Sequence, residues 1–407
     1  MKKVIIIGGG AAGLMAAAES AKRGNDTLII EKMPRPARKM MITGKGRCNV
    51  TNATFELDDL IKNVPTNGRF LYSAFSSFMP YDTIALVEEM GVETKIERGN
   101  RVFPVSDKAV DIVDAFVINA EQSGAEFMQG TVTAFEMKDG VITAVILENG
   151  DKLSCDAVAV CTGGASYPLT GSTGDGYRLA KMAGHTVTPL RPSLIPLVVS
   201  NNFIPKLQGL SLKNVCLKIT ESGKEIYSDF GEMLFTHFGI SGPIVLSASA
   251  HMREPEKKQY KAVIDLKPAL DEVTLDKRIQ REFMDNINKD FINSLSKLLP
   301  NKLIPVIVKL SQIEPSQKCN SITREQRQRL VKLLKGLTLD ITGFRPIEEA
   351  IVTSGGVNVK EINPKTMNSK IVSNLYFAGE VIDVDAYTGG FNLQTAFSTG
   401  YLCGNNI

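Results

Sequence analysis

The chain has 407 residues, more than one ordinary core holds, and this length predicts two or three domains. Its composition, with 43% hydrophobic and 22% charged residues, is typical of a soluble globular protein, and no apolar run approaches the roughly 18–20 residues that span a bilayer. A net charge of +3 is too small to indicate nucleic acid or an anionic membrane as a partner, so we expect neither.

The first thirty residues predict a strand, a glycine turn, a helix and a second strand. The β-branched run at residues 3–7 leads directly into Gly8-Gly9-Gly10-Ala11-Ala12-Gly13, and the stretch from Leu14 to Arg23 favours a helix. A second apolar run from Thr27 to Ile30 ends in Glu31. This order and spacing form the dinucleotide-binding fingerprint in its required context.

Each residue of this fingerprint has a physical role. Gly8 allows a tight turn off the strand, Gly10 allows a pyrophosphate to approach the backbone, and Gly13 allows the helix to pack closely on the sheet. The helix start favours phosphate charge. Glu31 suits a ribose 2′-hydroxyl and disfavours a 2′-phosphate, so NADP is not expected here. The fingerprint alone does not distinguish FAD from NAD.

A basic loop follows at residues 32–52. Its prolines and glycines exclude a regular element, and its central cations are Arg38, Lys39, Lys45 and Arg47. Because Gly44 and Gly46 permit a close backbone approach, we favour a second clamp on an anionic cofactor over a solvated loop.

The middle of the N-terminal region alternates helical and β-like signals. Helices are expected near 57–63, 68–78, 81–90, 107–122 (with Ser106 as N-cap) and 173–183, and β-like runs at 126–136, 141–148 and 156–161. Asp139-Gly140 between two of these runs predicts a hairpin. The run 156–161 has the composition of a buried parallel strand and ends in Thr162-Gly163-Gly164.

The pattern changes near residue 190 and returns near 345. Residues 191–268 are β-rich and residues 269–344 are helical, with a capping box at Thr323-Arg-Glu-Gln326. A buried-strand candidate at 374–378 then runs into Gly379-Glu380, and a helix is expected from Asn392 to Cys403. We therefore expect one α/β domain made of residues 1–190 and 345–407, with residues 191–344 inserted as a substrate or cap domain.

The cysteines and histidines suggest no metal site. The six cysteines form no CxxC, and with only three histidines no zinc pattern appears. Reduced thiols, and an apolar N-terminal run that breaks too early for a signal peptide, lead us to expect a cytoplasmic protein.

Many separate motifs resemble those of the BaiN-type flavoproteins, also called aminoacetone-oxidase-like, of the two-dinucleotide-binding-domain flavoprotein class. Besides Gly8–Gly13 with Glu31, the matching segments are Thr43–Asn52, Arg101–Ser106, Thr162–Pro168, Gly171–Gly176, Leu234–Pro243, Phe377–Asp383 and Thr388–Gln394. The resemblance covers essentially the whole chain. It implies a Rossmann-like FAD-binding domain with an inserted β-barrel-like and helical domain.

The resemblance also implies FAD in the first site and assigns residues to it. The implied cofactor residues are Gly8, Gly10, Ala11, Ala12, Gly13, Glu31, Lys32, Lys39, Thr43, Gly44, Lys45, Gly46, Arg47, Cys48, Asn49, Val132, Thr162, Gly163, Gly164, Gly379, Glu380, Asp383, Gly389, Gly390, Phe391, Asn392 and Leu393. Glu380 takes the place of the usual aspartate and is expected to reach the ribityl hydroxyls. The helix start after Gly390 is expected to point at the flavin pyrimidine, where amide N–H groups stabilise negative charge on the reduced ring.

Several chemistries stay open at this stage. The first is reduction of an activated C=C in a small-molecule substrate such as a steroid or bile-acid enone, with NAD(P)H as candidate reductant. The second is oxidation of an amine with release of peroxide, and the third is a flavin redox sensor or a protein associated with RNA modification. Larger tRNA-modifying flavoproteins share the N-terminal fingerprint, but the sequence suggests neither their extra basic surface nor their tail. His237, Tyr387 and Arg101 are the candidate catalytic residues, and His237 suits a structural role equally well.

Overall fold

The computed structural model describes residues 1–255 and 257–407, which form two compact units. The first unit joins the two ends of the chain, Met1–Ser193 and Pro346–Ile407, and the second is the segment Leu194–Arg345. Each unit has a hydrophobic core of its own. Among the described residues no helix is long and apolar enough to cross a bilayer.

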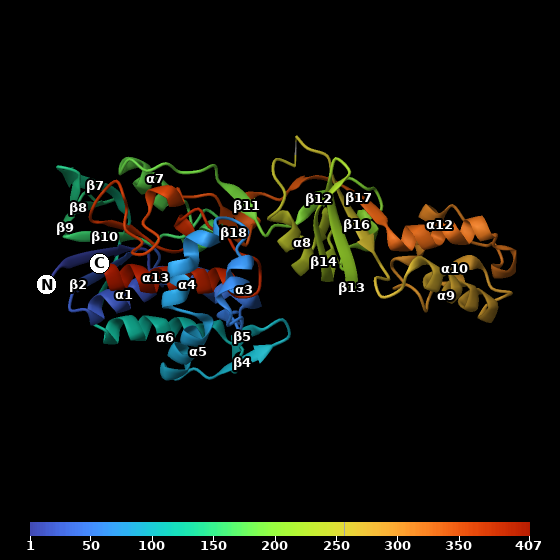
Figure 1. Ribbon diagram of the computed structural model, residues 1–407, viewed down its shortest axis with the longest axis horizontal. Helices are drawn as coiled ribbons and strands as arrows, with labels where there is room; N and C mark the ends of the chain where they lie inside the picture. Colours follow the sequence, from blue (N-terminus) through green and yellow to red (C-terminus); the bar gives the residue numbers. More distant parts are fainter. Residues whose placement is uncertain (256) are drawn as a thin grey trace. The chain divides into compact units, whose positions relative to one another are not determined.

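The first unit contains a five-stranded parallel sheet, whose strands β2 and β10 are labelled in Figure 1. Its strands in spatial order are β19 (Leu375–Phe377), β10 (Ala157–Val160), β1 (Lys3–Ile7), β2 (Asp26–Glu31) and β6 (Ala125–Gln129). β10 is buried along its whole length and β1 from its second residue on, as expected for central strands of a parallel sheet. Since all neighbours are parallel, the turns after β1, β2 and β10 open on one edge, where such sheets bind ligands.

Helices drawn from both ends of the chain pack together beside this sheet. They are α1 (Ala11–Lys22), α6 (Ala109–Gln122) and α13 (Phe391–Asn406). An ideal Cβ at Gly400 would lie 2.4 Å from the carbonyl oxygen of Ala12, and one at Gly404 would lie 2.3 Å from that of Ala16. The first and last helices are therefore in backbone contact, and only glycine fits at these two positions.

An antiparallel sheet and several short elements complete the first unit. The antiparallel strands are β7 (Val132–Lys138), β8 (Val141–Leu147) and β9 (Lys152–Ser154). The predicted hairpin joins β7 and β8, with positive φ at Asp139 and Gly140. The short elements are α2 (Arg38–Ile42), β3 (Thr51–Asn52), α3 (Leu57–Lys62), α4 (Tyr72–Ser77), α5 (Pro80–Glu89), β4 (Thr94–Glu97), β5 (Arg101–Pro104), α7 (Asp175–Met182), β11 (Arg191–Ser193) and β18 (Val352–Ser354).

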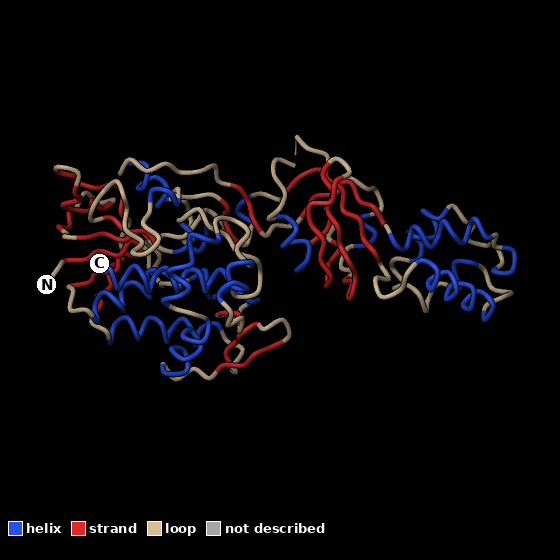
Figure 2. The backbone as a smooth tube through the Cα atoms, viewed as in Figure 1, coloured by secondary structure: helices blue, strands red, loops and turns tan. Residues whose placement is uncertain are grey.

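The second unit consists of a closed β-barrel and a group of helices, drawn red and blue in Figure 2. The barrel strands in spatial order are β12 (Leu197–Val199), β15 (Gly239–Ser241), β14 (Lys224–Phe235), β13 (Ser211–Glu221), β16 (Tyr260–Asp265) and β17 (Leu337–Phe344), with α8 (Pro243–Ser249) beside β14. The helices are α9 (Glu272–Asp285), α10 (Phe291–Ser294), α11 (Ile304–Ser311) and α12 (Arg324–Lys335). We call residues 266–335, which contain these four helices, the helical lobe.

The predicted fold class is confirmed, but several predicted elements differ. The prediction that residues 32–52 contain no regular element was wrong, because α2 fits between Pro36 and Gly44 and β3 follows. The β-like run predicted at 126–136 is divided between β6 and β7, and the region 269–344 predicted to be helical ends in the barrel strand β17.

The capping box of α12 forms as predicted, with the Thr323 hydroxyl accepting from the Gln326 amide. In contrast, α6 begins at Ala109 after Lys108, so the prediction that it starts beside Ser106 was wrong; the Ser106 hydroxyl accepts instead from the Lys108 amide. Such short-range hydrogen bonds compete with helical capping geometry.

Candidate cofactor site

The turn between β1 and α1 contains two glycines that the fold requires and a third that borders an open cleft. Gly8 has a φ of +100°, and an added Cβ would lie 2.7 Å from the carbonyl oxygen of Cys161. A Cβ at Gly13 would lie 1.9 Å from the carbonyl oxygen of Gly8. A Cβ at Gly10 would meet no described protein atom within 4 Å. The fold itself therefore requires Gly8 and Gly13, whereas Gly10 leaves an open cradle at the start of α1, as a pyrophosphate needs.

The Glu31 carboxylate at the end of β2 is fixed by backbone amides. Its two oxygens accept from the N–H of Gly9 at 2.7 Å and of Met33 at 2.8 Å. A carboxylate oxygen has more than one lone pair, so capacity remains for ribose hydroxyls. The ammonium group of the neighbouring Lys32 forms an ion pair of 2.6 Å with Asp175.

One cleft collects many of the predicted cofactor residues. Those that line it are Gly8, Gly10, Ala11, Ala12, Glu31, Lys32, Lys39, Thr43, Val132, Thr162, Gly163, Gly379, Glu380, Asn392 and Leu393. They come from residues 8–43, 132, 162–163 and 379–393, so distant segments converge on it. All its lining residues belong to the first unit.

The other predicted cofactor residues do not line this cleft. They are Gly13, Gly44, Lys45, Gly46, Arg47, Cys48, Asn49, Gly164, Asp383, Gly389, Gly390 and Phe391. Arg47 instead forms ion pairs with Glu97 and Asp107. Of the four central cations of the basic loop, only Arg38 and Lys39 face the cleft. A direct cofactor contact for residues 44–49 stays a prediction.

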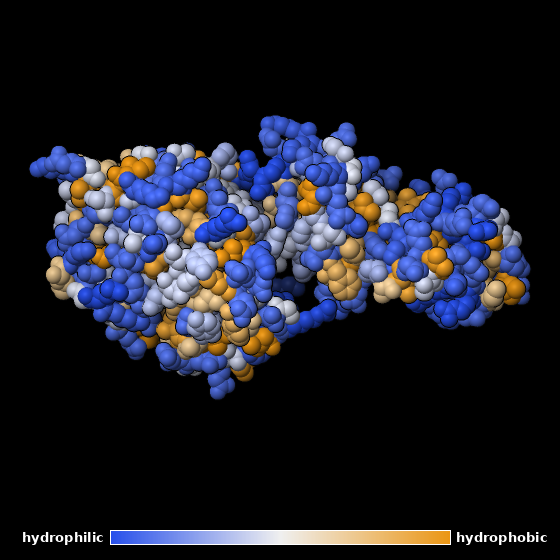
Figure 3. All heavy atoms as spheres, in the orientation of Figure 1, coloured by the Kyte–Doolittle hydropathy of each residue, from blue (hydrophilic) through white to orange (hydrophobic). Residues whose placement is uncertain are grey.

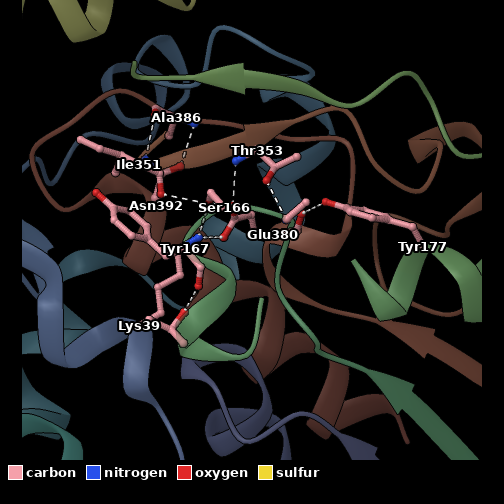
Figure 4. A network of polar contacts seen from close by, with 11 residues as sticks. Lys39, Ser166, Tyr167, Tyr177, Ile351, Thr353, Glu380, Ala386 and Asn392 are labelled. Carbon is pink, nitrogen blue, oxygen red and sulfur yellow. Dashed lines mark hydrogen bonds and ion pairs between the residues drawn. The ribbon is translucent and has the colours of Figure 1, made fainter. Parts of the chain in front are cut away.

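A network of polar contacts includes the cleft-lining residues Lys39 and Glu380 (Figure 4). The Lys39 ammonium donates to the Glu380 carboxylate at 2.7 Å and to the Ser166 hydroxyl at 2.7 Å. The other Glu380 oxygen accepts from the Thr353 amide at 2.8 Å. The charge of Glu380 is thus compensated within the protein. Its oxygens are held at the cleft surface, where the hydroxyl groups of a polyol chain could donate hydrogen bonds to them.

The start of α13 supplies free backbone donors to the same cleft. Gly390 precedes the helix with a φ of +103°, and a Cβ there would lie 2.3 Å from the Thr51 carbonyl. The side chain of Asn392 is fixed by two hydrogen bonds to the backbone of Ala386, of 3.0 and 2.8 Å. Asn392 and Leu393 line the cleft, and their amides precede the first intrahelical bond of α13, which Gln394 makes. A helix of sixteen residues therefore presents its positive end to a ligand in this cleft.

These features fit a flavin dinucleotide. The open space at Gly10 suits a pyrophosphate, and the starts of α1 and α13 supply backbone N–H donors for its charge and for that of a reduced flavin ring.

The thiols near the cleft are not poised for redox chemistry. Burial raises the pKa of Cys161, which lines the cleft, to about 12, and that of Cys48 also to about 12. Both thiols are therefore protonated at neutral pH, and the thiolate is the reactive form in disulfide exchange. This agrees with the absence of a CxxC pair in the sequence.

None of the three candidate catalytic residues lines the cleft. His237 is exposed in the second unit, at the turn between β14 and β15, and its ring contacts Phe238 edge to face. Arg101 is exposed on β5, where its guanidinium donates to the carbonyl of Arg98 at 3.0 Å. Tyr387 is half-buried in the loop before α13. Their catalytic roles stay predictions.

Sequence reasoning missed part of the lining. The additional residues are Ile7, Ile30, Arg35, Ala37, Met40, Gly130, Thr131, Cys161, Thr170, Gly171, Ser172, Asp175, Ile351, Val352, Val384, Thr395 and Ala396, whereas Arg38 is one of the predicted cations of the basic loop. The motif Gly171-Ser-Thr-Gly-Asp-Gly176 was a signal for one of these segments. The apolar residues of the lining belong to no motif, because many small or branched apolar side chains would form the same wall.

The sequence matches a known family over almost its full length. Residues 2–406 match the family described as the HI0933-like protein Rossmann domain. The chain is 31% identical over 403 residues to a ribosomal RNA dihydrouridine synthase of Escherichia coli strain K12, covering 99% of this chain and 97% of the relative. It is 30% identical over 413 residues to a 3-dehydro-bile acid delta(4,6)-reductase of Clostridium scindens, covering 99% and 98%.

A solved structure supports the fold. A flavocytochrome c3 fumarate reductase in an open conformation superposes with a TM-score of 0.53 at 15% identity, covering 100% of this chain and 78% of that one. At this identity the likeness speaks for the shared architecture.

Proposed function

The chain belongs to the HI0933-like Rossmann family and is an FAD-dependent oxidoreductase, and from that premise we propose that it reduces a C=C bond conjugated with a carbonyl group. The observation that carries the proposal is the chemistry shared by the relatives, which match this chain end to end. A 3-oxo bile acid with ring double bonds is an enone, and the C5=C6 bond of uridine is conjugated with the C4 carbonyl. Reduction adds a hydride at the carbon distant from the carbonyl and a proton at the carbon beside it.

The residues of the cleft have separate tasks in this proposal. Gly10 and the start of α1 would hold the pyrophosphate, and Glu31 would hold the adenosine ribose. Lys39 and Ser166 orient the Glu380 carboxylate, so that it would accept hydrogen bonds from the ribityl chain. The amides of Asn392 and Leu393 would stabilise negative charge on the ring system. The flavin, when bound, supplies the two-electron chemistry.

The reductant and the proton donor belong to the proposal as well. NAD(P)H is the candidate reductant, and Tyr387, Arg101 and His237 are candidates to protonate the product or polarise its carbonyl. The protonated thiols of Cys48 and Cys161 disfavour a dithiol as electron donor.

An anaerobic stopped-flow experiment tests the proposal. The FAD-loaded protein is mixed first with NADH or NADPH and then with a 3-oxo-Δ4 steroid or a uridine-containing ribosomal RNA fragment. In a separate run, the oxidised protein is mixed with a primary amine and no nicotinamide. We expect the reduced flavin to be reoxidised by one of the two alkenes, and the product to be heavier by two hydrogen atoms in mass spectrometry. Bleaching of the oxidised flavin by the amine, with peroxide release in air, would contradict the proposal and support an amine oxidase. A flavin that neither alkene reoxidises would also contradict it.

A further inference from the structure

The positive charge of this protein is concentrated in one part of the chain. Residues 194–345 contain 23 Lys and Arg against 16 Asp and Glu, a net charge of +7, whereas the first unit has a net charge of −4. Most of the excess lies in the helical lobe, with 14 basic and 8 acidic residues. The whole-chain value of +3, from which no nucleic-acid partner is expected, is therefore the sum of two unlike parts.

Ion pairing within the lobe leaves cations in excess. Asp276 pairs with Arg327 at 2.6 Å, Asp290 with Lys318 at 2.8 Å, and Glu282 and Asp285 both with Lys297. The Asp271 side chain accepts from the Thr274 amide and caps α9. The exposed cations of the lobe without an ion-pair partner among the described residues are Lys277, Arg281, Lys289, Lys302, Lys309, Arg324, Arg329 and Lys332.

Four of these cations form two short rows on neighbouring helices. On α9, the apolar side chains of Leu275, Ile279 and Phe283 are buried, and Lys277 and Arg281 lie on the opposite, exposed side. They are four residues apart and thus adjacent on the helix surface.

The second row lies on α12, whose buried side contains Leu330, Val331 and Leu334. Arg329 and Lys332, three residues apart, are exposed opposite to it. The two helices pack against each other and are joined by the Arg327–Asp276 ion pair. The lobe thus presents cations without ion-pair partners on two helices that are packed together.

We propose that these rows of cations on α9 and α12 bind the phosphate backbone of an RNA substrate. The choice of RNA rests on the proposed function, since uridine in RNA is one of its two substrate classes. Arginine side chains that project from helices suit phosphate groups, which they bind through two N–H donors. A lipid surface would also need a row of apolar anchors. Every exposed residue of α12 is polar or charged (Arg324, Glu325, Gln328, Arg329 and Lys332), and the exposed apolar residues of α9 are only Val273 and Met284, eleven positions apart. In Figure 3 hydrophilic side chains cover most of the visible face of the lobe.

The test compares two variants of the full-length, FAD-loaded protein that lose the same charge. The lobe variant combines Lys277→Gln, Arg281→Gln, Arg329→Gln and Lys332→Gln. The control variant combines Lys138→Gln, Lys181→Gln, Lys360→Gln and Lys365→Gln, which are exposed positions of the first unit. The probe is a fluorescently labelled RNA hairpin containing uridines, with binding followed by anisotropy as salt is varied. Melting temperature and flavin spectrum confirm that both variants are folded.

We expect the lobe variant to bind the hairpin at least about tenfold more weakly, with a salt dependence shallower by roughly 0.7–0.9 logarithmic units per lost phosphate contact. The control variant should retain its affinity within about twofold. Equal weakening in both variants, no hairpin binding by the unaltered protein, or binding of anionic vesicles in preference to RNA would each overturn the proposal. Because binding is measured without turnover, tight RNA binding with reduction of neither alkene would contradict the proposed function and leave this surface standing.

Discussion

At the residue scale, the buried His185 is expected to make stability depend on pH. Its ring nitrogens contact Ser369 at 2.7 Å and Glu361 at 3.2 Å, and Phe377 packs edge-on against the ring. Burial lowers the pKa of His185, although Glu361 opposes this shift. In the unfolded chain a histidine titrates near roughly 6.5 and takes up its proton more readily than the folded protein does. Stability is therefore full above that pH and decreases as pH falls below it.

The prediction is checked by urea unfolding of the protein and of His185→Gln between about pH 7.5 and 5. The free energy of unfolding should decrease less with falling pH in the variant than in the unaltered protein. The pKa of Glu361 is lowered, because hydrogen bonds from Thr186 and the charge of His185 outweigh its burial. Its own contribution is thus lost only at lower pH. His237→Gln, at an exposed position, is the control and should leave the slope unchanged. Parallel slopes for protein and His185→Gln would contradict the prediction.

In the β1–α1 turn, we expect one glycine to be needed for cofactor binding and another to be needed for folding. A Cβ at Gly10 meets no described protein atom, and Gly10 has an extended backbone with a φ of −82°. We expect Gly10→Ala to fold with an unchanged melting temperature in the absence of FAD, and to bind FAD at least about tenfold more weakly, because the methyl group enters the pyrophosphate cradle. Flavin fluorescence titration measures the affinity.

Two further variants make this comparison specific. Gly343→Ala is the matched control, since its Cβ also meets open space but lies in the second unit, and its affinity for FAD should not change. Gly13→Ala should destabilise the protein itself, because its Cβ would overlap the Gly8 carbonyl oxygen. If Gly10→Ala retained full FAD affinity, the cradle would not contact the cofactor.

Local sequence patterns were sufficient to predict some elements, but not the contacts between residues far apart in the chain. The β1–α1–β2 segment and the α12 capping box follow from residues within a few positions of each other, so periodicity and turn chemistry were sufficient. The direction of Arg47 was not readable, because its partners Glu97 and Asp107 lie 50 and 60 positions away. The same holds for the Lys39–Glu380 pair, whose members are 341 positions apart. Sequence motifs therefore predict candidate cofactor residues, and only the fold shows which of them line one cleft.

The whole molecule consists of one unit into which a second unit is inserted. The two ends of the inserted segment meet, since Leu197 on β12 pairs with Phe344 on β17 and the Arg345 amide donates to the Pro196 carbonyl at 3.3 Å. In the first unit, the flanking strands β11 and β18 pair with each other, with Ser193 opposite Val352. An insertion whose ends are adjacent is compatible with independent folding of both parts.

This arrangement predicts that FAD binding and RNA binding can be assigned to two separately produced parts of the chain. A chain in which a short Gly-Ser linker replaces residues 194–345 should fold and bind FAD, because every residue lining the cleft is retained. The isolated segment 194–345 should fold around its own core, bind the RNA hairpin and contain no flavin. Circular dichroism, flavin absorbance and hairpin anisotropy measure the three properties. Loss of FAD from the shortened chain, despite a cooperative melting transition, would show that the inserted unit contributes to the cofactor site. RNA binding that stays with the shortened chain would place the RNA-binding surface outside the helical lobe.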